Sequence, residues 1–507
     1  MSLRHLIERL RRALISPAAP MALGLVVLAL ILDLRPLSDP DFYWHLAAGN
    51  WILAHGSIPS SDLFSWWATG HAWIDQEWGS EILTALAYRA GGTTGYALAY
   101  LPLIGGILGL MALVIRRSPV RPGAMGTAAL LLIGSLVGLG VFAPRAQMWD
   151  LLLGLAVLWS LFDWRAGGRR GRMVLPLVAL AWANLHGGGL PVFGLICLGF
   201  LVGGELDFRL GWSARAPAHY GPLILALIAS IVAAALNPSG LAVYGYWAGT
   251  VLSAAQRSTI SEWASPDFSL LVYWPLLAWI TAGLVIGAAA RIRNGTVLLL
   301  SGGFAVMALL SYRFSGLYGV ISAALVGPYL LAAGARLVGR LTERSRGTPP
   351  ALPLRALVMG LISLLLAVRL VGLAIPGSDT TYLDSHFPVG AADWLSSHPH
   401  GRIFNLYQWG GYLAWRLDEP IAVYGAADVL GDAILLEDAN LVLMRESPDA
   451  FLMTAEVKTV VMDPKLPLSV YLRSRPEWGV VYEDQVAVIF VWQGVSGSSG
   501  PRIIPSP

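Results

Sequence analysis

The sequence predicts an α-helical polytopic membrane protein with a small α/β domain at its C-terminal end. Of the 507 residues, 56% are hydrophobic and only 13% are charged, whereas soluble domains usually carry about 25% charged residues. The mean hydropathy is +0.63. Long apolar runs follow one another along residues 1–375, and the pattern changes to short segments from residue 376 onward. Lipid is therefore the expected solvent for most of the chain.

The apolar runs define about eleven candidate membrane helices, because a span needs roughly 17 to 25 apolar residues. The runs are 20–35, 94–115, 124–143, 147–164, 173–186, 189–205, 221–237, 270–290, 295–311, 315–334 and 353–374. The first run follows a basic segment, as in a secretory signal peptide, but no small residues suited to cleavage come after it. We therefore interpret it as an uncleaved first membrane helix.

Basic residues alternate from one connection to the next, which predicts the orientation of the chain. Lys and Arg accumulate in short cytoplasmic loops. With the N-terminal arginines inside, every second connection is basic, at Arg116, Arg165, Arg209, Arg291 and Arg336. This alternation predicts a multi-pass protein of the bacterial inner membrane, with a cytoplasmic N-terminus and a periplasmic region from about residue 376.

Residues 376–495 are predicted to form a periplasmic α/β domain, since short β-rich segments alternate there with helical ones. Expected strands are RIFNLY from Arg402, IAVYG from Ile421, KTVVMD from Lys458 and VAVIFVW from Val486, and expected helices are PVGAADWLSSH and PLSVYLRS. The domain either caps the membrane part or handles substrate. Residues 496–507 are expected to be a disordered tail.

Several classes of function are disfavoured. The net charge of +3 is small and the basic residues lie in short clusters, so nucleic acid is not an expected partner. The single cysteine, Cys197, excludes an internal disulfide. The chain also has no GxxxxGK[ST] phosphate loop, no GxSxG motif and no HExxH motif.

The first outer loop, residues 36–80, is unusually rich in acidic residues, histidines and tryptophans. A plain connector needs only a few polar residues. Asp39 and Asp41 follow the first membrane helix and precede FYWHLAAGNWILAHG, which we interpret as an amphipathic interfacial helix with Trp44 and Trp51 at the headgroup level. Asp41 is either a plain helix N-cap or a functional carboxylate, and the acidic loop that follows favours function.

His45 lies four residues after Asp41, on the same helical face. The two side chains either form an ion pair or jointly bind a divalent cation. Asp75 and Glu77 close the loop as a second acidic cluster, which either is solvated or approaches the first cluster to hold a cation or orient an acceptor. The candidate metal ligands are Asp39, Asp41 and Glu77, and the candidate cation is Mg²⁺ or Mn²⁺.

Further ionisable residues lie at the predicted outer ends of membrane helices, where such groups are functional candidates. They are Arg145, His186, Glu262 and Arg313, all expected to bind substrate. The planar guanidinium of Arg145 or Arg313 suits a phosphate, because it makes bidentate contacts. The alternative for each is a structural ion pair.

One membrane helix, then an acidic motif that opens a helix at Asp41, then a loop ending in Asp75, Gln76 and Glu77, together form a recognisable arrangement. With about eleven membrane helices and a C-terminal α/β domain, it resembles the GT-C-fold integral membrane glycosyltransferases. The chain is also similar to a group of bacterial membrane proteins. The shared segments are DPDFYWHL, WIDQEW, ANLHGG, LNPSG from Leu236 and NLYQWGGYL from Asn405.

The resemblance implies a hexosyl- or pentosyltransferase that inverts the sugar carbon, takes a polyprenyl-phosphate sugar as donor and delivers it to a cell-envelope acceptor. It places the general base on Asp41, with Asp39 and Glu77 as further catalytic candidates, and the donor phosphate on Arg145 or Arg313. His45 and Asp75 are expected to bind substrate. The chain departs from the family in one segment, where Ile-Asp-Gln-Glu-Trp replaces Lys-Pro-Pro near the end of the first loop.

Two other functions are compatible with the sequence. A transporter or flippase of polyprenyl-linked glycans would place ionisable groups near the bilayer midplane and often contains internal repeats; here the polar residues lie near the outer ends, and no repeat is visible. A glycan polymerase or ligase would share the large outer loops and differ in its acceptor.

Overall fold

The structure is a computed structural model that describes residues 19–33, 39–213, 220–342, 368 and 380–494. The chain divides into two compact units. Unit 1 comprises residues 1–36, 97–240 and 262–374, and unit 2 comprises residues 37–96, 241–261 and 375–507. Each unit therefore contains segments that are distant in sequence.

Unit 1 is a helical bundle. Its helices are α2 (Ala19–Asp33), α5 (Leu101–Ile115), α6 (Ala124–Val137), α7 (Met148–Arg165), α8 (Arg170–Leu185), α9 (Leu190–Arg209), α10 (Gly221–Ala234), α13 (Trp274–Ala290), α14 (Gly295–Leu310), α15 (Ser315–Leu325) and α16 (Gly327–Thr342). Short 3₁₀ turns, η1 (Gly187–Gly189) and η4 (Tyr312–Phe314), join α8 to α9 and α14 to α15. The first ten apolar runs each fall on one or two of these helices, and the run 353–374 lies outside the described residues.

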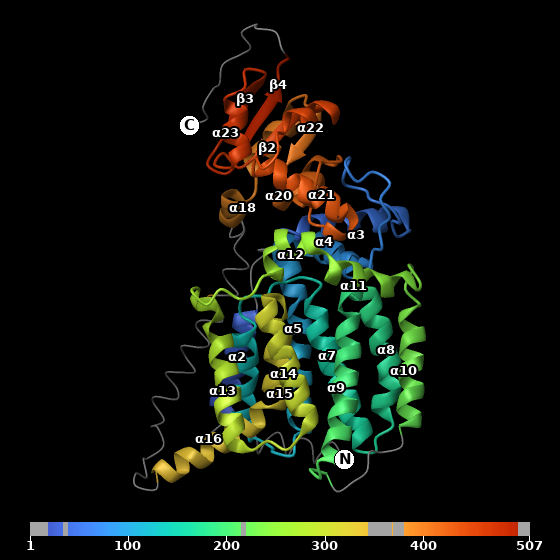
Figure 1. Ribbon diagram of the computed structural model, residues 1–507, viewed down its shortest axis with the longest axis vertical. Coiled ribbons are helices and arrows are strands. Elements are labelled where there is room, and N and C mark those ends of the chain that lie inside the picture. The colour runs from blue at the N-terminus through green and yellow to red at the C-terminus, as the bar shows by residue number, and fades with distance from the viewer. Residues whose placement is uncertain (1–18, 34–38, 214–219, 343–367, 369–379, 495–507) are drawn as a thin grey trace. The chain divides into compact units, whose positions relative to one another are not determined.

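The helices of unit 1 pack side by side, with α7 against α8, α8 against α10 and α9 against α14 (Figure 1). Large apolar side chains remain exposed on several helices, among them Leu225 on α10 and Leu284 and Val285 on α13, each more than 60% exposed. An exposed apolar surface of this kind is stable when lipid covers it. The unit therefore has the surface of a membrane-embedded bundle.

Three helical segments of the described chain are long and apolar enough to cross a membrane: Trp78–Ile115, Gly187–Arg209 and Leu271–Ala290. The pair Tyr312–Leu325 and Gly327–Arg336 makes a fourth if it counts as one span, although it bends by 54° at the break. The run predicted as one helix over 315–334 is thus two helices. Eleven spans stay a prediction, because most of the other apolar helices are shorter.

Unit 2 contains a four-stranded sheet of order β1-β2-β4-β3. The strands are β1 (Arg402–Asn405), β2 (Val457–Met462), β3 (Trp478–Glu483) and β4 (Val488–Trp492). The pair β1 and β2 is parallel, and β4 runs antiparallel to β2 and β3. The helices that accompany the strands are α18 (Thr380–His386), α19 (Val389–Ser397), α20 (Tyr407–Leu417), α21 (Ala427–Val442), α22 (Asp449–Thr454) and α23 (Pro467–Arg473). The predicted α/β domain is confirmed.

Two strand predictions differ from the structure. IAVYG from Ile421 is buried but is not a strand, because the side chain of Asn405 takes its backbone groups: the Asn405 amide accepts from Ala422 N at 2.9 Å and donates to the Val423 carbonyl at 2.8 Å. Conversely, WGVVYE forms β3, which was not predicted. Its register shifts between Val480 and Tyr482, and this irregularity disturbs the alternation that marks a strand.

The first loop, assigned to the membrane domain from sequence, folds together with the C-terminal residues in unit 2. It contributes α3 (Phe42–His55) and the start of α4 (Trp78–Ala99). Main-chain hydrogen bonds join the loop to the irregular IAVYG segment, from Trp66 N to the Ile421 carbonyl at 3.0 Å and from Ile421 N to the Phe64 carbonyl at 2.9 Å. The IAVYG segment, whose Ala422 and Val423 backbone groups bond to the Asn405 side chain, thus uses the Ile421 backbone groups to pair with the first loop.

A third segment of unit 2, residues 241–261, forms α11 (Ala242–Leu252) and α12 (Ala254–Thr259). The Ser253 hydroxyl caps α12 by accepting from Gln256 N and donates to Asp432 of α21 at 2.6 Å.

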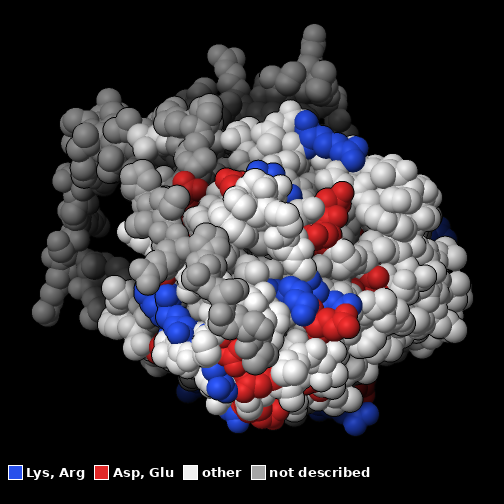
Figure 2. Space-filling model, turned by 90° about the horizontal axis from the view of Figure 1, so that it is seen from above, with Lys and Arg blue, Asp and Glu red and all other residues white. Residues whose placement is uncertain are grey.

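Figure 2 shows one face of the molecule, on which Lys and Arg lie interspersed with Asp and Glu. Mixed charge of this kind is typical of a water-exposed surface.

Candidate active site

Asp41 stands at the N-cap position of α3, but its carboxylate makes no capping hydrogen bond. A capping Asp accepts from a backbone N–H at the second or third helical position and has extended backbone angles. Asp41 instead has helical angles (φ −76°, ψ −16°), and its Oδ1 accepts from the indole Nε1 of Trp44 at 3.2 Å. The Asp41 side chain therefore does not cap α3, and a functional role for this carboxylate stays a prediction.

The C-terminal part of unit 2 forms a wall beside the Asp41 carboxylate. Gly425 lies so close that a Cβ at this position would overlap Asp41 Oδ1 and the Trp44 indole nitrogen. The Tyr407 hydroxyl donates to the Gly425 carbonyl at 2.9 Å. Burial, and to a smaller extent the negative charge of Asp41, raise the pKa of Tyr407 well above its usual value. Only glycine at 425 leaves room for the carboxylate.

Substituting Gly425 with alanine is expected to lower transfer activity by about tenfold to a hundredfold, because a misplaced reacting group costs about that much. The added methyl group would push the Asp41 carboxylate away from its present position. The check is the initial rate of the sugar transfer that the sequence resemblance implies. Gly245→Ala in α11 of the same unit is the matched control, since nothing lies within 4 Å of its Cβ position. Equal activity of Gly425→Ala and wild type would contradict the proposed placement of Asp41.

His45 of α3 lies between two carboxyl groups, those of Glu77 and Glu81. Its Nδ1 is 3.0 Å from Glu81 Oε1, and its Nε2 is 3.4 Å from Glu77 Oε2. Each ring nitrogen of His45 therefore lies next to a carboxyl group. Glu77 is fixed further by the Gln76 amide, which donates to its Oε1 at 2.7 Å. The second acidic cluster of the loop thus lies against His45 of α3.

Asp75 completes this cluster and is almost fully buried. Its Oδ1 accepts from Glu77 N at 3.2 Å, and its carboxyl is hydrogen-bonded to that of Glu81. Burial raises the pKa of Asp75 to about 7, and the negative charges of Glu77 and Asp428 raise it in the same direction. Asp75 is therefore protonated in mildly acidic solution, and burial raises the pKa of its partner Glu81 well above its usual value as well.

The raised pKa of Asp75 predicts a pH-dependent stability. The folded state binds this proton more tightly than the unfolded state, so the stabilisation is present at about pH 4 and is lost as pH rises towards and beyond 7. We expect the thermal unfolding midpoint to fall by several degrees between pH 5 and pH 8, and to fall less in Asp75→Asn. A residual slope is expected, because burial also raises the pKa of Asp438 to about 8. An unchanged slope in Asp75→Asn would contradict this assignment.

The surroundings of Trp44 differ from the prediction, whereas a catalytic role for Asp39 stays a prediction. Trp44 was expected among lipid headgroups, but it is only 8% exposed and packs against Trp73 and Tyr424. Helix α20 covers α3, with Tyr412 against Tyr43 at 4.9 Å between ring centroids. Asp39, predicted as catalytic, is buried and its Oδ1 accepts from Asp41 N at 3.1 Å. This contact positions the backbone of Asp41.

Unit 1 holds a second cluster, in which two arginines share one carboxylate. Arg145, in the connection between α6 and α7, donates through Nη1 to Glu262 Oε1. Arg313 of η4 places its Nη1 3.9 Å from Glu262 Oε2, and its guanidinium lies 5.3 Å from the ring centroid of Trp263. Burial alone would raise the pKa of Glu262, but Arg145 and Arg313 hold it below its usual value.

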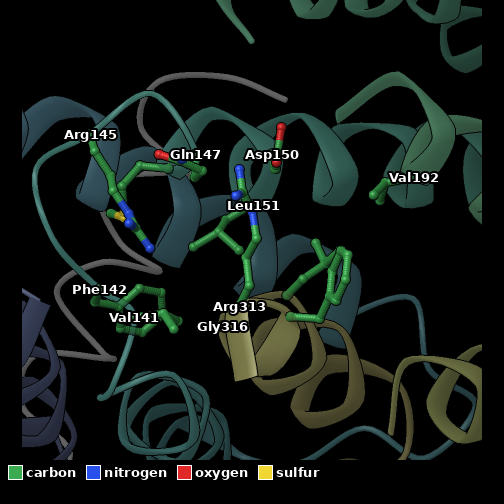
Figure 3. A pocket seen from close by; sticks show the side chains of 12 residues that line it. Val141, Phe142, Arg145, Gln147, Asp150, Leu151, Val192, Arg313 and Gly316 are labelled. Carbon is green, nitrogen blue, oxygen red and sulfur yellow. The ribbon is translucent and has the colours of Figure 1, made fainter. Parts of the chain in front are cut away.

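Both arginines also line a pocket of unit 1 (Figure 3). Gln147 and Asp150 are the other polar residues of its wall, and the remaining lining is mostly apolar. The apolar side chains are Val141, Phe142, Met148, Leu151, Val192, Phe314 and Leu317. An apolar wall with two guanidinium groups suits an amphiphilic ligand that has an anionic group and an apolar part.

His186 follows the last residue of α8, and its Nδ1 is hydrogen-bonded to Asp150 Oδ1 at 2.7 Å. The same oxygen accepts from the Trp182 indole at 2.7 Å. Gly189 permits this arrangement, since a Cβ there would overlap both Asp150 and the Trp182 indole nitrogen. His186 is thereby linked, through Asp150, to the wall of the pocket lined by Arg145 and Arg313, which we call the arginine pocket.

The predicted metal ligands do not form a cation site of their own. Within the described ranges, no group of three or more His, Cys, Asp or Glu side chains has an arrangement that could hold a metal ion. Asp39 is turned to the Asp41 backbone, and Glu77 is turned to His45 and Gln76. A divalent cation as cofactor stays a prediction.

Sequence reasoning missed several residues of these clusters. Asp150, Tyr407, Gly425 and Asp428 were not singled out, although Tyr407 lies in the NLYQWGGYL segment. Asp428 stands in the first turn of α21, and its charge raises the pKa of Asp75. Asp150, Gly425 and Asp428 belong to no local motif, so only the distances in the folded chain identify them.

Comparison with known proteins gives matches among solved structures, whereas no protein-family model and no curated protein matches the sequence. ArnT from Cupriavidus metallidurans bound to undecaprenyl phosphate aligns with a TM-score of 0.51 and 16% identity, over 96% of this chain and 100% of that one. The apo state of the same protein aligns with a TM-score of 0.52 and 16% identity, over 95% and 98%. The oligosaccharyltransferase of Archaeoglobus fulgidus aligns with a TM-score of 0.50 and 14% identity, over 87% and 69%. The chain therefore has the GT-C fold of integral membrane glycosyltransferases.

Proposed function

We propose that the protein is an inverting glycosyltransferase that moves a sugar from a polyprenyl-phosphate donor to a hydroxyl of a cell-envelope acceptor on the periplasmic side of the bacterial inner membrane. The observation that carries the proposal is the Asp41 carboxylate, which opens α3 without capping it. The fold supports the general reaction, because the ArnT structure with the same fold is bound to undecaprenyl phosphate.

In the proposed reaction, the acceptor oxygen attacks the anomeric carbon as the bond from that carbon to the phosphate oxygen breaks. Asp41 takes the hydroxyl proton as the attack develops, since a carboxylate is too weak a base to remove it beforehand. The donor is a phosphodiester with one negative charge, and the leaving lipid phosphate is a monoester that ends with two. One displacement inverts the sugar carbon.

We assign the donor phosphate to Arg145 and Arg313, which line the mostly apolar pocket of unit 1. Guanidinium groups stabilise the charge that accumulates on the phosphate as it leaves. His186 and Asp150 are assigned to the wall that orients the donor, and Glu77, His45 and Asp75 to the network that orients the acceptor. Asp39 positions Asp41 through its backbone.

The test is an assay of the purified full-length protein with a panel of polyprenyl-phosphate sugars and envelope acceptors. The expected result is transfer with inversion, measured by the anomeric configuration of the product. Retention of configuration would exclude a single displacement. Movement of the intact lipid-linked glycan across vesicles, without cleavage of the phosphate bond, would instead favour the flippase.

A further inference from the structure

The two arginines of the unit 1 pocket lie beside a carboxylate that opposes their charge from outside the pocket wall, in addition to Asp150 within the wall. Arg145 and Arg313 both lie against Glu262, whose side chain is about one-quarter exposed. Because the arginines hold the pKa of Glu262 below its usual value, this carboxylate stays ionised down to mildly acidic pH. The three side chains together therefore carry a net charge of about +1 rather than +2.

The Glu262 carboxylate lies beside two guanidinium groups, at unequal distances. Arg313 is already stabilised by the Trp263 ring, and its nitrogen stands 3.9 Å from Glu262, a longer contact than that of Arg145. Meanwhile the Ser311 hydroxyl fixes the backbone of Glu262 by donating to its carbonyl at 2.8 Å. The carboxylate is thus held beside both guanidinium groups by contacts that do not depend on a ligand.

The two lipids of the proposed reaction differ by one charge at the phosphate. A polyprenyl-phosphate sugar is a diester with a charge of −1 at any pH near neutrality. The polyprenyl phosphate left after transfer is a monoester, which carries nearly −2 above its second pKa of about 6. A pocket of two unopposed arginines would therefore bind the product more tightly than the donor, and product would accumulate on the enzyme.

We propose that Glu262 weakens the hold of Arg145 and Arg313 on the dianionic product more than on the monoanionic donor, and so promotes release of the spent lipid. This role rests on the proposed function. The repulsion between Glu262 and the phosphate is proportional to the phosphate charge. If removal of the Glu262 charge tightens binding of a monoanionic phosphate by a factor f, it tightens binding of the dianion by about f².

The experiment measures binding of undecaprenyl phosphate and of its methyl ester, a diester probe, to the full-length protein in nanodiscs at pH 8. Wild type is compared with Glu262→Gln, whose amide oxygen still accepts from Arg145. We expect binding of the diester to tighten by roughly fivefold and that of the monoester by roughly 25-fold. At pH 5 the monoester is mainly a monoanion, so both lipids should then tighten equally.

Two further variants make the result specific. Glu205→Gln removes one carboxylate from the same unit, at an exposed ion pair with Arg209 in the last turns of α9, and should leave both affinities unchanged. Glu262→Asp shortens the side chain by one methylene group, which moves the carboxylate farther from the two arginines. It should give smaller shifts that keep the same square relation, and it provides the measurement if Glu262→Gln does not fold.

Equal tightening of both lipids at pH 8, no change, or weaker binding would each overturn the role of Glu262. These outcomes differ from failure of the proposed function. If the wild-type protein binds neither undecaprenyl phosphate nor its methyl ester, the polyprenyl-phosphate reaction itself is wrong, and the role of Glu262 falls with it.

Discussion

Asp41→Asn is expected to lower the rate of sugar transfer by about 10²- to 10⁴-fold, the usual contribution of a positioned general base. The amide keeps the size of the side chain and can still accept from the Trp44 indole, so α3 should remain folded. What it loses is the ability to take the acceptor proton. The measurement is the single-turnover rate with a radiolabelled polyprenyl-phosphate sugar.

The matched control is Asp39→Asn, two residues earlier. Asp39 acts on the backbone of Asp41 through one hydrogen bond, which the amide oxygen of Asn can also accept, so a loss of less than about tenfold is expected. Binding of the donor lipid should be unchanged in Asp41→Asn. Full activity of Asp41→Asn would remove this carboxylate from the mechanism.

Arg145→Met is expected to weaken binding of the donor lipid by about 10- to 100-fold, the range expected when a hydrogen bond to a charged group is lost. Methionine fills a similar apolar volume but cannot donate to a phosphate. Since Arg145 also pairs with Glu262, its loss leaves a carboxylate with one partner fewer, and the variant should be less stable as well.

A double-mutant cycle separates the two roles of Arg145. In the Glu262→Gln background no carboxylate is left for Arg145 to neutralise, so the stability cost of Arg145→Met should largely disappear. The loss of lipid binding should persist in that background by a similar factor. If Arg145→Met has no effect on lipid binding once Glu262 is neutral, Arg145 is a structural ion-pair partner and not a phosphate ligand.

The helices of unit 1 were predictable because their signal is local. A run such as 270–290 is apolar throughout, and α13 occupies nearly the same residues. The break within 315–334 was missed, although Pro328 lies inside that run and a proline ends or kinks a helix just before it. The bend lies at Val326, between α15 and α16. Apolar composition alone therefore predicted where the helices lie, and the proline signal was needed to predict the bend.

The clusters were predictable only in part, for a related reason. The sequence places His45 near Asp41 by helical spacing, yet the partners that the structure gives it, Glu77 and Glu81, come from the other end of the loop. Gly425 and Asp150 were missed because their roles arise from contacts with residues far along the chain. Spacing along one helix cannot reveal such pairs, whereas a close approach between segments does.

The pairing of Phe64 and Trp66 with Ile421 sets an order of events during synthesis. The first loop leaves the ribosome more than 300 residues before its partner, so its backbone groups stay unpaired while the helices of unit 1 from α5 to α16 are synthesised. Contacts of such sequence separation form late and slowly. A nascent chain that stops before the C-terminal region would thus have its membrane bundle in place but no wall beside Asp41.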